Sequence, residues 1–144
     1  MSKTPKQVVQ ELQRIAAKHD GILKAEDVVT EAKRKSSPIH DQFTWDDSEA
    51  GHQYRLWQAR QLIRCSVIME QRTETQVRAF VSLSPNRTED GGGYKETVRV
   101  LSRKEDRAQL LADALAELKV FETKYRMLTE LTGVFEEARR VRIA

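Results

Sequence analysis

The sequence predicts a mainly α-helical protein with one β-hairpin, an α+β fold. Of its 144 residues 39% are hydrophobic, 33% charged and only 6% aromatic, which suits amphipathic helices better than a thick sheet core. Hydrophobic side chains recur at helical spacing along most of the chain and alternate, as in strands, only between Val77 and Leu101. We expect two domains: a helix–turn–helix-like lobe over residues 1–47, and an oligomerisation module over residues 48–144 that contains a helix, the hairpin and a long C-terminal helix.

Two short helices make up the expected N-terminal lobe. Thr4-Pro5 suits a helix start, and Val8, Val9, Leu12, Ile15 and Ala16 follow at helical spacing, which predicts a helix over Pro5–Lys18. His19-Asp20-Gly21 ends that helix, and a second helix is expected over Ala25–Lys35, before Ser36-Ser37-Pro38. This outline is shared with DNA-reading helix–turn–helix proteins, but Glu26, Asp27 and Glu31 precede the basic end of the second helix. We therefore favour a structural or protein-contacting lobe over a DNA-reading one.

The next expected helix runs from Ser48 to Arg72. Asp47 or Ser48 can cap its first turn, and Leu56, Ala59, Ile63 and Val67 form an apolar stripe that Trp57 and Leu62 widen. Arg60 and Arg64 lie one turn apart on another face. We expect the aromatic residues around its start to form one buried cluster that docks the lobe on this helix: Phe43, Trp45, Tyr54 and Trp57.

Two strands are expected after this helix, over residues 77–83 and 94–101. The polar segment between them, residues 84–93, ends in three glycines and predicts a flexible hairpin tip, since it matches no phosphate-binding motif. The arginines of the hairpin could instead line a basic ribbon for nucleic acid. Interspersed acidic residues favour the solvated hairpin.

The last expected element is a long helix that opens at Ser102, where Glu105 completes a capping-box pattern. Apolar residues then repeat at spacings of four and three for more than three heptads. An unbroken helix to Arg140 would be about 55–60 Å long, more than any partner within the chain, so we expect a homo-oligomer, with a dimer as first choice. Gly133 could instead kink the helix and fold its tail back. The residues assigned to the oligomer interface are Leu111, Leu115, Leu118, Phe121, Tyr125 and Leu128.

A segment of the chain resembles small proteins of tailed bacteriophages and prophages, most of them uncharacterised. The resemblance rests on Pro38, His40, Asp41, Phe43, Trp45 to Ser48, Tyr54 to Leu56, Gln58 to Arg60 and Leu62 to Arg64, and it continues through Arg78 to Val81, Tyr94 and the helix over Leu110 to Phe135. It implies a phage-like origin and a place in the cytoplasm of a bacterial host. It carries no assigned activity.

Charge permits a polyanionic partner. The formal net charge is +3, and residues 48–72 hold four arginines against two glutamates. Guanidinium groups on this helix and on the hairpin are the expected contacts with phosphates, and such contacts weaken with salt. The assigned nucleic-acid-binding residues are Arg60, Arg64, Arg72, Arg78, Arg87 and Arg99.

The sequence offers little for catalysis or metal binding. His19, His40 and His52 lie in different elements, and the single cysteine, Cys65, cannot complete a structural zinc site, so we expect no metal and no cofactor. We expect Cys65 to be a buried thiol, in keeping with a reducing cytoplasm. A hydrolase based on Asp46 and its neighbours is disfavoured, because Asp46 already has a role in helix entry. No apolar run approaches the length that spans a membrane.

Two function classes follow from these observations. The first, which we favour slightly, is a phage- or prophage-encoded, non-enzymatic nucleic-acid-binding or regulatory protein that acts on duplex DNA as a homo-oligomer. The alternative is a phage assembly factor, or a protein–protein adaptor or inhibitor, that binds no nucleic acid.

Overall fold

The computed structural model describes residues 4–88 and 92–143 and divides into two compact units, Met1–Arg99 and Val100–Ala144. Helices account for 62% of it, and the strands are few, short and antiparallel, so the predicted mainly α fold is confirmed. The expected domain boundary after Asp47 falls inside the first unit, because the helices on either side of it share one core.

The first two helices begin as the sequence predicts. Helix α1 covers Pro5–Lys18, and the side chains of Thr4 and Gln7 cap each other's backbone N–H groups. Gly21, at φ +80°, turns the chain into the two-residue strand β1, Ile22–Leu23. Helix α2 covers Ala25–Ala32 and is shorter than the expected Ala25–Lys35. It ends early where the ring of His40, at the start of the short 3₁₀ helix η1 (His40–Gln42), lies 2.7 Å from the Ala32 carbonyl oxygen.

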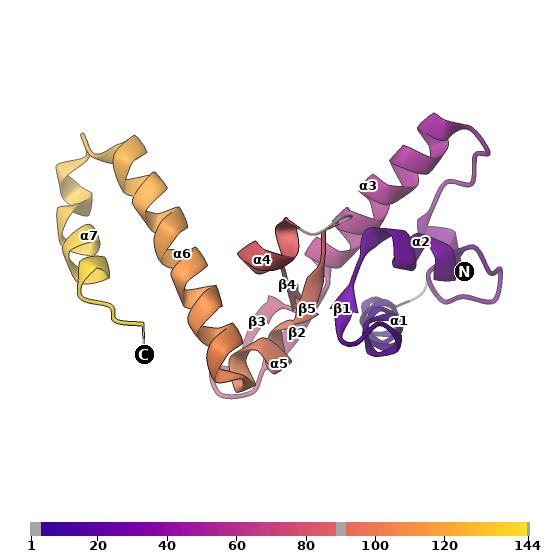
Figure 1. Ribbon diagram of the computed structural model, residues 1–144, viewed down its shortest axis with the longest axis horizontal. Coiled ribbons are helices and arrows are strands. Elements are labelled where there is room, and N and C mark those ends of the chain that lie inside the picture. Colours follow the sequence, from indigo (N-terminus) through magenta and orange to yellow (C-terminus); the bar gives the residue numbers. More distant parts are fainter. Residues whose placement is uncertain (1–3, 89–91, 144) are drawn as a thin grey trace. The chain divides into compact units, whose positions relative to one another are not determined.

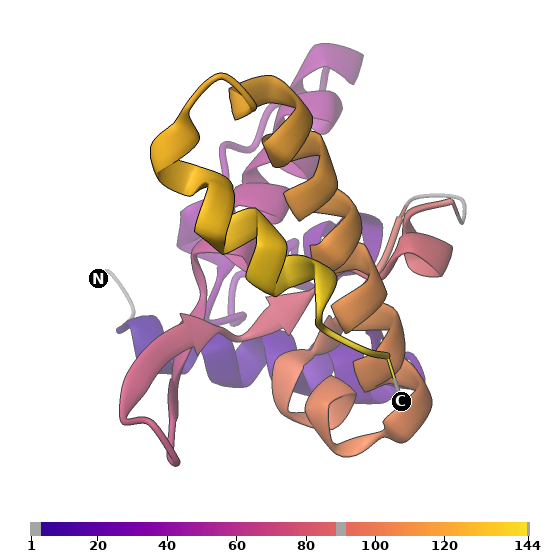
Figure 2. The same cartoon turned by 90° about the vertical axis from the view of Figure 1, so that its left-hand side faces the viewer.

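Helix α3 covers Glu49–Cys65, with Ser48 as its N-cap as predicted. The predicted extension to Arg72 is wrong. Ser66 adopts an extended backbone, and the chain continues as strand β2, Val67–Glu70, which pairs in antiparallel fashion with β3, Thr75–Arg78. The β-branched residues Val67 and Ile68 favour a strand over the last turns of a helix. In Figure 2 this hairpin leaves the helices of its unit as an extended ribbon.

The predicted strands over 77–83 and 94–101 are only partly correct. Strand β4, Phe80–Val81, does pair with β5, Tyr94–Glu96, and β1 adds to the other edge of β5, giving the order β1-β5-β4. Part of the expected hairpin tip is a helical turn, α4 (Ser84–Arg87), and residues 89–91 of that tip lie outside the described residues. The second expected strand turns into helix α5, Thr97–Ser102, where the Thr97 hydroxyl donates to the Arg78 carbonyl.

The core of the first unit joins α1, α2, α3 and β4 (Figure 1). The helices contribute the apolar faces that their spacing predicts. Strand β4 contributes Phe80, the largest fully buried side chain. The largest fully buried residues are Leu12, Ile15, Leu23, Val28, Val29, Ile39, Ile63 and Phe80 within this unit. This core fixes which face of α3 points outward.

The second unit is a helical hairpin and not one long helix. Helix α6 covers Lys104–Tyr125, the 3₁₀ helix η2 covers Thr129–Leu131, and α7, Thr132–Arg139, runs back alongside α6 (Figure 2). The predicted unbroken helix to Arg140 is therefore wrong, and so is the predicted cap, because Arg103 and not Ser102 is the N-cap of α6. The tail folds back, as in the alternative reading, but the helix ends at Tyr125 and not at Gly133. The return places Phe135 edge-on against Phe121, with ring centroids 6.1 Å apart.

Candidate nucleic-acid interface

The loop before α3, residues 43–48, is hydrogen-bonded to side chains of that helix. Arg55 is buried, donates to the Asp46 carbonyl and lies 5.3 Å from the centre of the Trp45 ring. Gln58 accepts a hydrogen bond from the Thr44 N–H at 3.0 Å. The Ser48 backbone N–H and hydroxyl hold the pKa of Asp46 below its usual value. These bonds hold the loop of residues 44–48 against α3 and fix the start of the helix.

Gly51 is required for this close approach. A Cβ atom at Gly51 would lie 2.6 Å from the Asp46 carbonyl oxygen and 2.7 Å from the Asp46 Cβ. Since the first of these atoms belongs to the backbone, the loop itself would have to move. The first turn of α3 therefore contains a glycine, although glycine is a poor helix former.

The predicted aromatic cluster is wrong in its extent. Phe43 is buried and packs against Trp45, and Trp45 stacks on His40 with ring centroids 4.9 Å apart. Tyr54 and Trp57 stack on each other instead, 5.7 Å apart. Trp45, Tyr54 and Trp57 are 37%, 48% and 52% exposed, so three of the four rings face solvent in part. The Tyr54–Trp57 pair thus belongs to the outer surface.

The outer face of α3 carries aromatic, amide and guanidinium groups and no carboxylate. Residues 50–69 contain no Asp or Glu. At about 100° per residue, the buried Ala59 and Ile63 lie opposite a face centred near Trp57, Gln61 and Arg64, with Arg60 at its edge. Trp57 and Arg64 are exposed, whereas Gln61 and Arg60 are both half-buried. The prediction that Trp57 widens the apolar stripe is therefore wrong, since Trp57 lies on the exposed face.

The arginines of α3 differ in what they bind. Arg55 donates a hydrogen bond to the Asp46 carbonyl in the loop. Within residues 4–88 and 92–143, neither Arg60 nor Arg64 forms an ion pair or hydrogen bond through its side chain. Two guanidinium groups are therefore free for a ligand, on a stretch of chain without Asp or Glu.

The arginines predicted on the hairpin do not form one site. Arg78 is exposed in β3, and its residue pairs with Val67, two positions beyond the end of α3. Arg72 is exposed in the turn between β2 and β3, near Glu70. Arg87 in α4 donates to the Ser82 carbonyl at 2.8 Å, and Arg99 in α5 extends over Gly21. Arg78 and Arg72 thus continue from α3 along the hairpin, while Arg87 and Arg99 have structural contacts of their own.

Glu31, near the end of α2, binds three cations. Glu31 accepts from Arg14 at 2.8 Å and from Lys18 at 2.5 Å, and it also binds Arg34. These cations lower the pKa of Glu31 to about 2. Arg34 is therefore engaged in an ion pair, while the neighbouring Lys33 and Lys35 are exposed.

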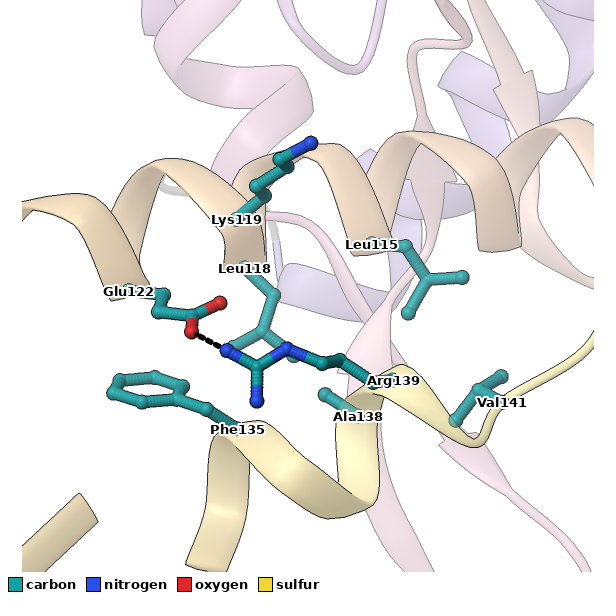
Figure 3. A pocket seen from close by; sticks show the side chains of 8 residues that line it. All are labelled: Leu115, Leu118, Lys119, Glu122, Phe135, Ala138, Arg139 and Val141. Carbon is teal, nitrogen blue, oxygen red and sulfur yellow. Dashed lines mark hydrogen bonds and ion pairs between the residues drawn. The ribbon is translucent and has the colours of Figure 1, made fainter. Parts of the chain in front are cut away.

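Two of the six residues assigned to the oligomer interface, Leu115 and Leu118, line a cavity within the second unit. A cavity of about 380 Å³ lies between α6 and α7, bordered by Leu115, Leu118 and Phe135. In Figure 3 Glu122 and Arg139 form an ion pair across it, and Lys119 points away. The charges of Glu122 and Arg139 thus neutralise each other, and Lys119 is the other charged residue that borders the cavity.

The three histidines and the cysteine are not brought together. His19 lies 3.7 Å from Asp27, His52 lies 3.4 Å from Glu26, and His40 contacts the Ala32 carbonyl. Among the described residues no group of three or more His, Cys, Asp or Glu side chains is placed to hold a metal ion. Cys65 is exposed, so the prediction of a buried thiol is wrong.

None of the helices in the described parts of the chain is long and apolar enough to cross a membrane. Comparison with protein-family models, curated proteins and solved structures found no significant match for the chain.

Proposed function

We propose that this protein is a non-enzymatic, nucleic-acid-binding regulator, encoded by a phage or prophage, whose helix α3 contacts duplex DNA in the bacterial cytoplasm. The observation that carries the proposal is the outer face of α3, where Arg60 and Arg64 stand free of carboxylates on a stretch without acidic residues. Phosphates are the ligands that such a surface attracts most strongly.

The arrangement of the first unit supports this use of α3. Helix α2 packs across α3, and hairpin β2–β3 follows α3 directly. In helix–turn–helix proteins one helix lies in the major groove while its neighbour crosses the backbone, and β-ribbons of other proteins also enter a groove. The connection between α2 and α3 is longer than the three- or four-residue turn of those proteins, so the support is an analogy of arrangement and not of family. Arg72 and Arg78 give the hairpin cations to meet the backbone beside α3.

We further propose that the protein acts as a homo-oligomer, with a dimer as the first choice. Helix length does not support an oligomer, because α6 ends at Tyr125 and α7 covers part of it. The support is that several apolar side chains of the second unit stay exposed, Val120 at 70% and Leu128 at 41% among them. Units this small rarely bury enough apolar surface alone.

Binding of labelled duplex DNA at low salt, measured by fluorescence anisotropy, tests the proposal. We expect binding at micromolar protein, and at least tenfold weaker binding after Arg60→Ala with Arg64→Ala, because two phosphate-attracting charges are lost. The matched control, Arg34→Ala with Lys35→Ala, removes the same charge from the end of α2 and should change affinity little. Absence of binding by the wild type, or equal losses in both double variants, would reject α3 as the interface.

The stacked and exposed Tyr54–Trp57 pair favours one alternative, an adaptor or assembly factor that binds a protein. Trp, Tyr and Arg are the residues most often found at the centres of protein interfaces. This alternative predicts no DNA binding at low salt, together with loss of the partner when Trp57 is changed to Ala. The DNA measurement therefore decides between the two classes.

A further inference from the structure

Helix α3 contains three glutamines, and their side chains are used differently. Gln53 donates to Glu49 at 3.1 Å, and Gln58 binds the backbone and hydroxyl of Thr44. The amide of Gln61 makes no hydrogen bond with any described residue. Of the glutamines on this helix, Gln61 is thus the one whose amide is free for a ligand, and it lies on the face that carries Arg64.

We propose that the protein reads DNA sequence, with Gln61 binding an adenine and Arg64 binding a guanine on neighbouring base pairs in the major groove. This inference rests on the proposed function and adds base recognition to the phosphate contacts. An amide can pair with the N6 and N7 atoms of adenine, and a guanidinium with the O6 and N7 atoms of guanine, each through two hydrogen bonds. Both side chains are of the types that these pairings need.

The spacing of the two residues suits adjacent base pairs. Gln61 and Arg64 are three residues apart on one helical face, which separates them by about 4.5 Å along the axis. The base pairs of B-DNA are about 3.4 Å apart, so a helix lying along the groove brings each side chain to a different pair. By helical geometry Gln61 and Arg64 lie near the centre of the outer face, where a helix in the groove comes closest to the bases; Arg64 is exposed and Gln61 is half-buried. Arg60, half-buried at the edge of that face, is positioned for a phosphate.

The test is selection of bound duplexes from a pool with a randomised core, using the full-length protein. Dissociation constants for the selected duplex and its single-base variants then measure each preference. We expect the wild type to select a motif with neighbouring A and G positions and to discriminate at each by about five- to 150-fold. Gln61→Ala should lose the adenine preference alone, and Gln61→Asn, which keeps a shorter amide, should weaken it.

Charge-preserving substitutions separate base reading from attraction to phosphates. Arg64→Lys keeps the positive charge but loses the planar two-bond geometry, so the guanine preference should fall while binding to unrelated sequences stays within about twofold. Gln53→Ala is the matched control on the same helix and should keep both preferences. Thermal melting followed by circular dichroism shows whether each variant is folded.

The outcomes separate the two claims. DNA binding without an enriched motif, or a motif that Gln61→Ala and Arg64→Lys leave unchanged, would overturn base recognition and leave the proposed function standing. Absence of DNA binding at low salt would overturn both.

Discussion

At the scale of single residues, two helical glycines meet very different surroundings. A Cβ at Gly51 would press on the backbone of Asp46, whereas a Cβ at Gly133 in α7 would meet nothing within 4 Å. We predict that Gly51→Ala destabilises the protein by about 1–3 kcal/mol despite alanine's higher helix propensity, because the loop over α3 must shift. Gly133→Ala is the control and should be neutral or stabilising by up to about 1 kcal/mol. Urea unfolding measures both, and a stabilised Gly51→Ala would show that the loop does not pack on α3 as described.

The ion pairs of Glu31 make stability depend on pH. Its pKa falls from 4.5 to about 2, chiefly because Lys18 and then Arg14 donate hydrogen bonds to the carboxylate. A pKa that is lower in the folded state adds stability above pH 4.5, and this contribution is lost as the pH falls towards 2. We predict that Glu31→Gln lowers the free energy of unfolding by about 1 kcal/mol at pH 7, since the cations are partly exposed.

The difference between Glu31→Gln and the wild type should shrink steadily as the pH is lowered from 4.5. Urea unfolding at a series of pH values measures it. Asp41→Asn, at an exposed carboxylate, is the control and should show little difference from the wild type at any pH. A Glu31→Gln deficit that stays constant down to the acid limit would contradict the assigned ion pairs.

At the scale of elements, the starts of α1, α2 and α3 were predictable from the sequence, whereas the ends of α2 and α3 were not. Thr4 and Ser48 cap α1 and α3 as expected, because capping depends on residues that are adjacent in sequence. The ends of α2 and α3 depend on distant partners. His40 lies at the Ala32 carbonyl, and the Ala79 N–H donates to the Ser66 carbonyl where β2 begins. Apolar spacing alone could not reveal either bond.

The same limit explains the second unit. The heptad-like repeat continues from Leu111 to Phe135 with no break in its spacing, so the sequence predicted one helix. The chain turns between Tyr125 and Thr132 because Phe135 then packs on Phe121, a contact between residues that an unbroken helix would keep far apart. The apolar residues of α6 that were predicted to contact another subunit are thus covered in part by α7 of the same chain.

The candidate site was also predictable only in part. Arg60 and Arg64 could be assigned from their spacing and from the lack of acidic neighbours. The commitment of Arg55 to the loop, and the freedom of Gln61 compared with Gln53 and Gln58, follow from how residues 43–48 fold over α3. Such contacts between side chains and a distant loop leave no periodic signal in the sequence.

At the scale of the whole molecule, the proposed oligomer can be tested without disturbing either core. Val120 and Leu128 are exposed, so Val120→Lys with Leu128→Lys should lower the mass in solution towards that of a monomer while helix content stays unchanged. Val98→Lys changes an equally exposed valine in α5 and is the control. Light scattering measures the mass. A wild type that is monomeric at micromolar concentration would reject the homo-oligomer.

The central claim, that α3 presents its free arginines to the phosphates of DNA, is tested most directly by the salt dependence of binding. The logarithm of the association constant should fall linearly with the logarithm of salt concentration, by roughly 0.9 for each phosphate neutralised. We predict that Arg60→Ala with Arg64→Ala makes this slope shallower by about 0.9–1.8, whereas Arg87→Ala, at an arginine bonded to the Ser82 carbonyl, leaves it unchanged. A double variant with the slope of the wild type, or a wild type that binds no duplex at low salt, would contradict the claim.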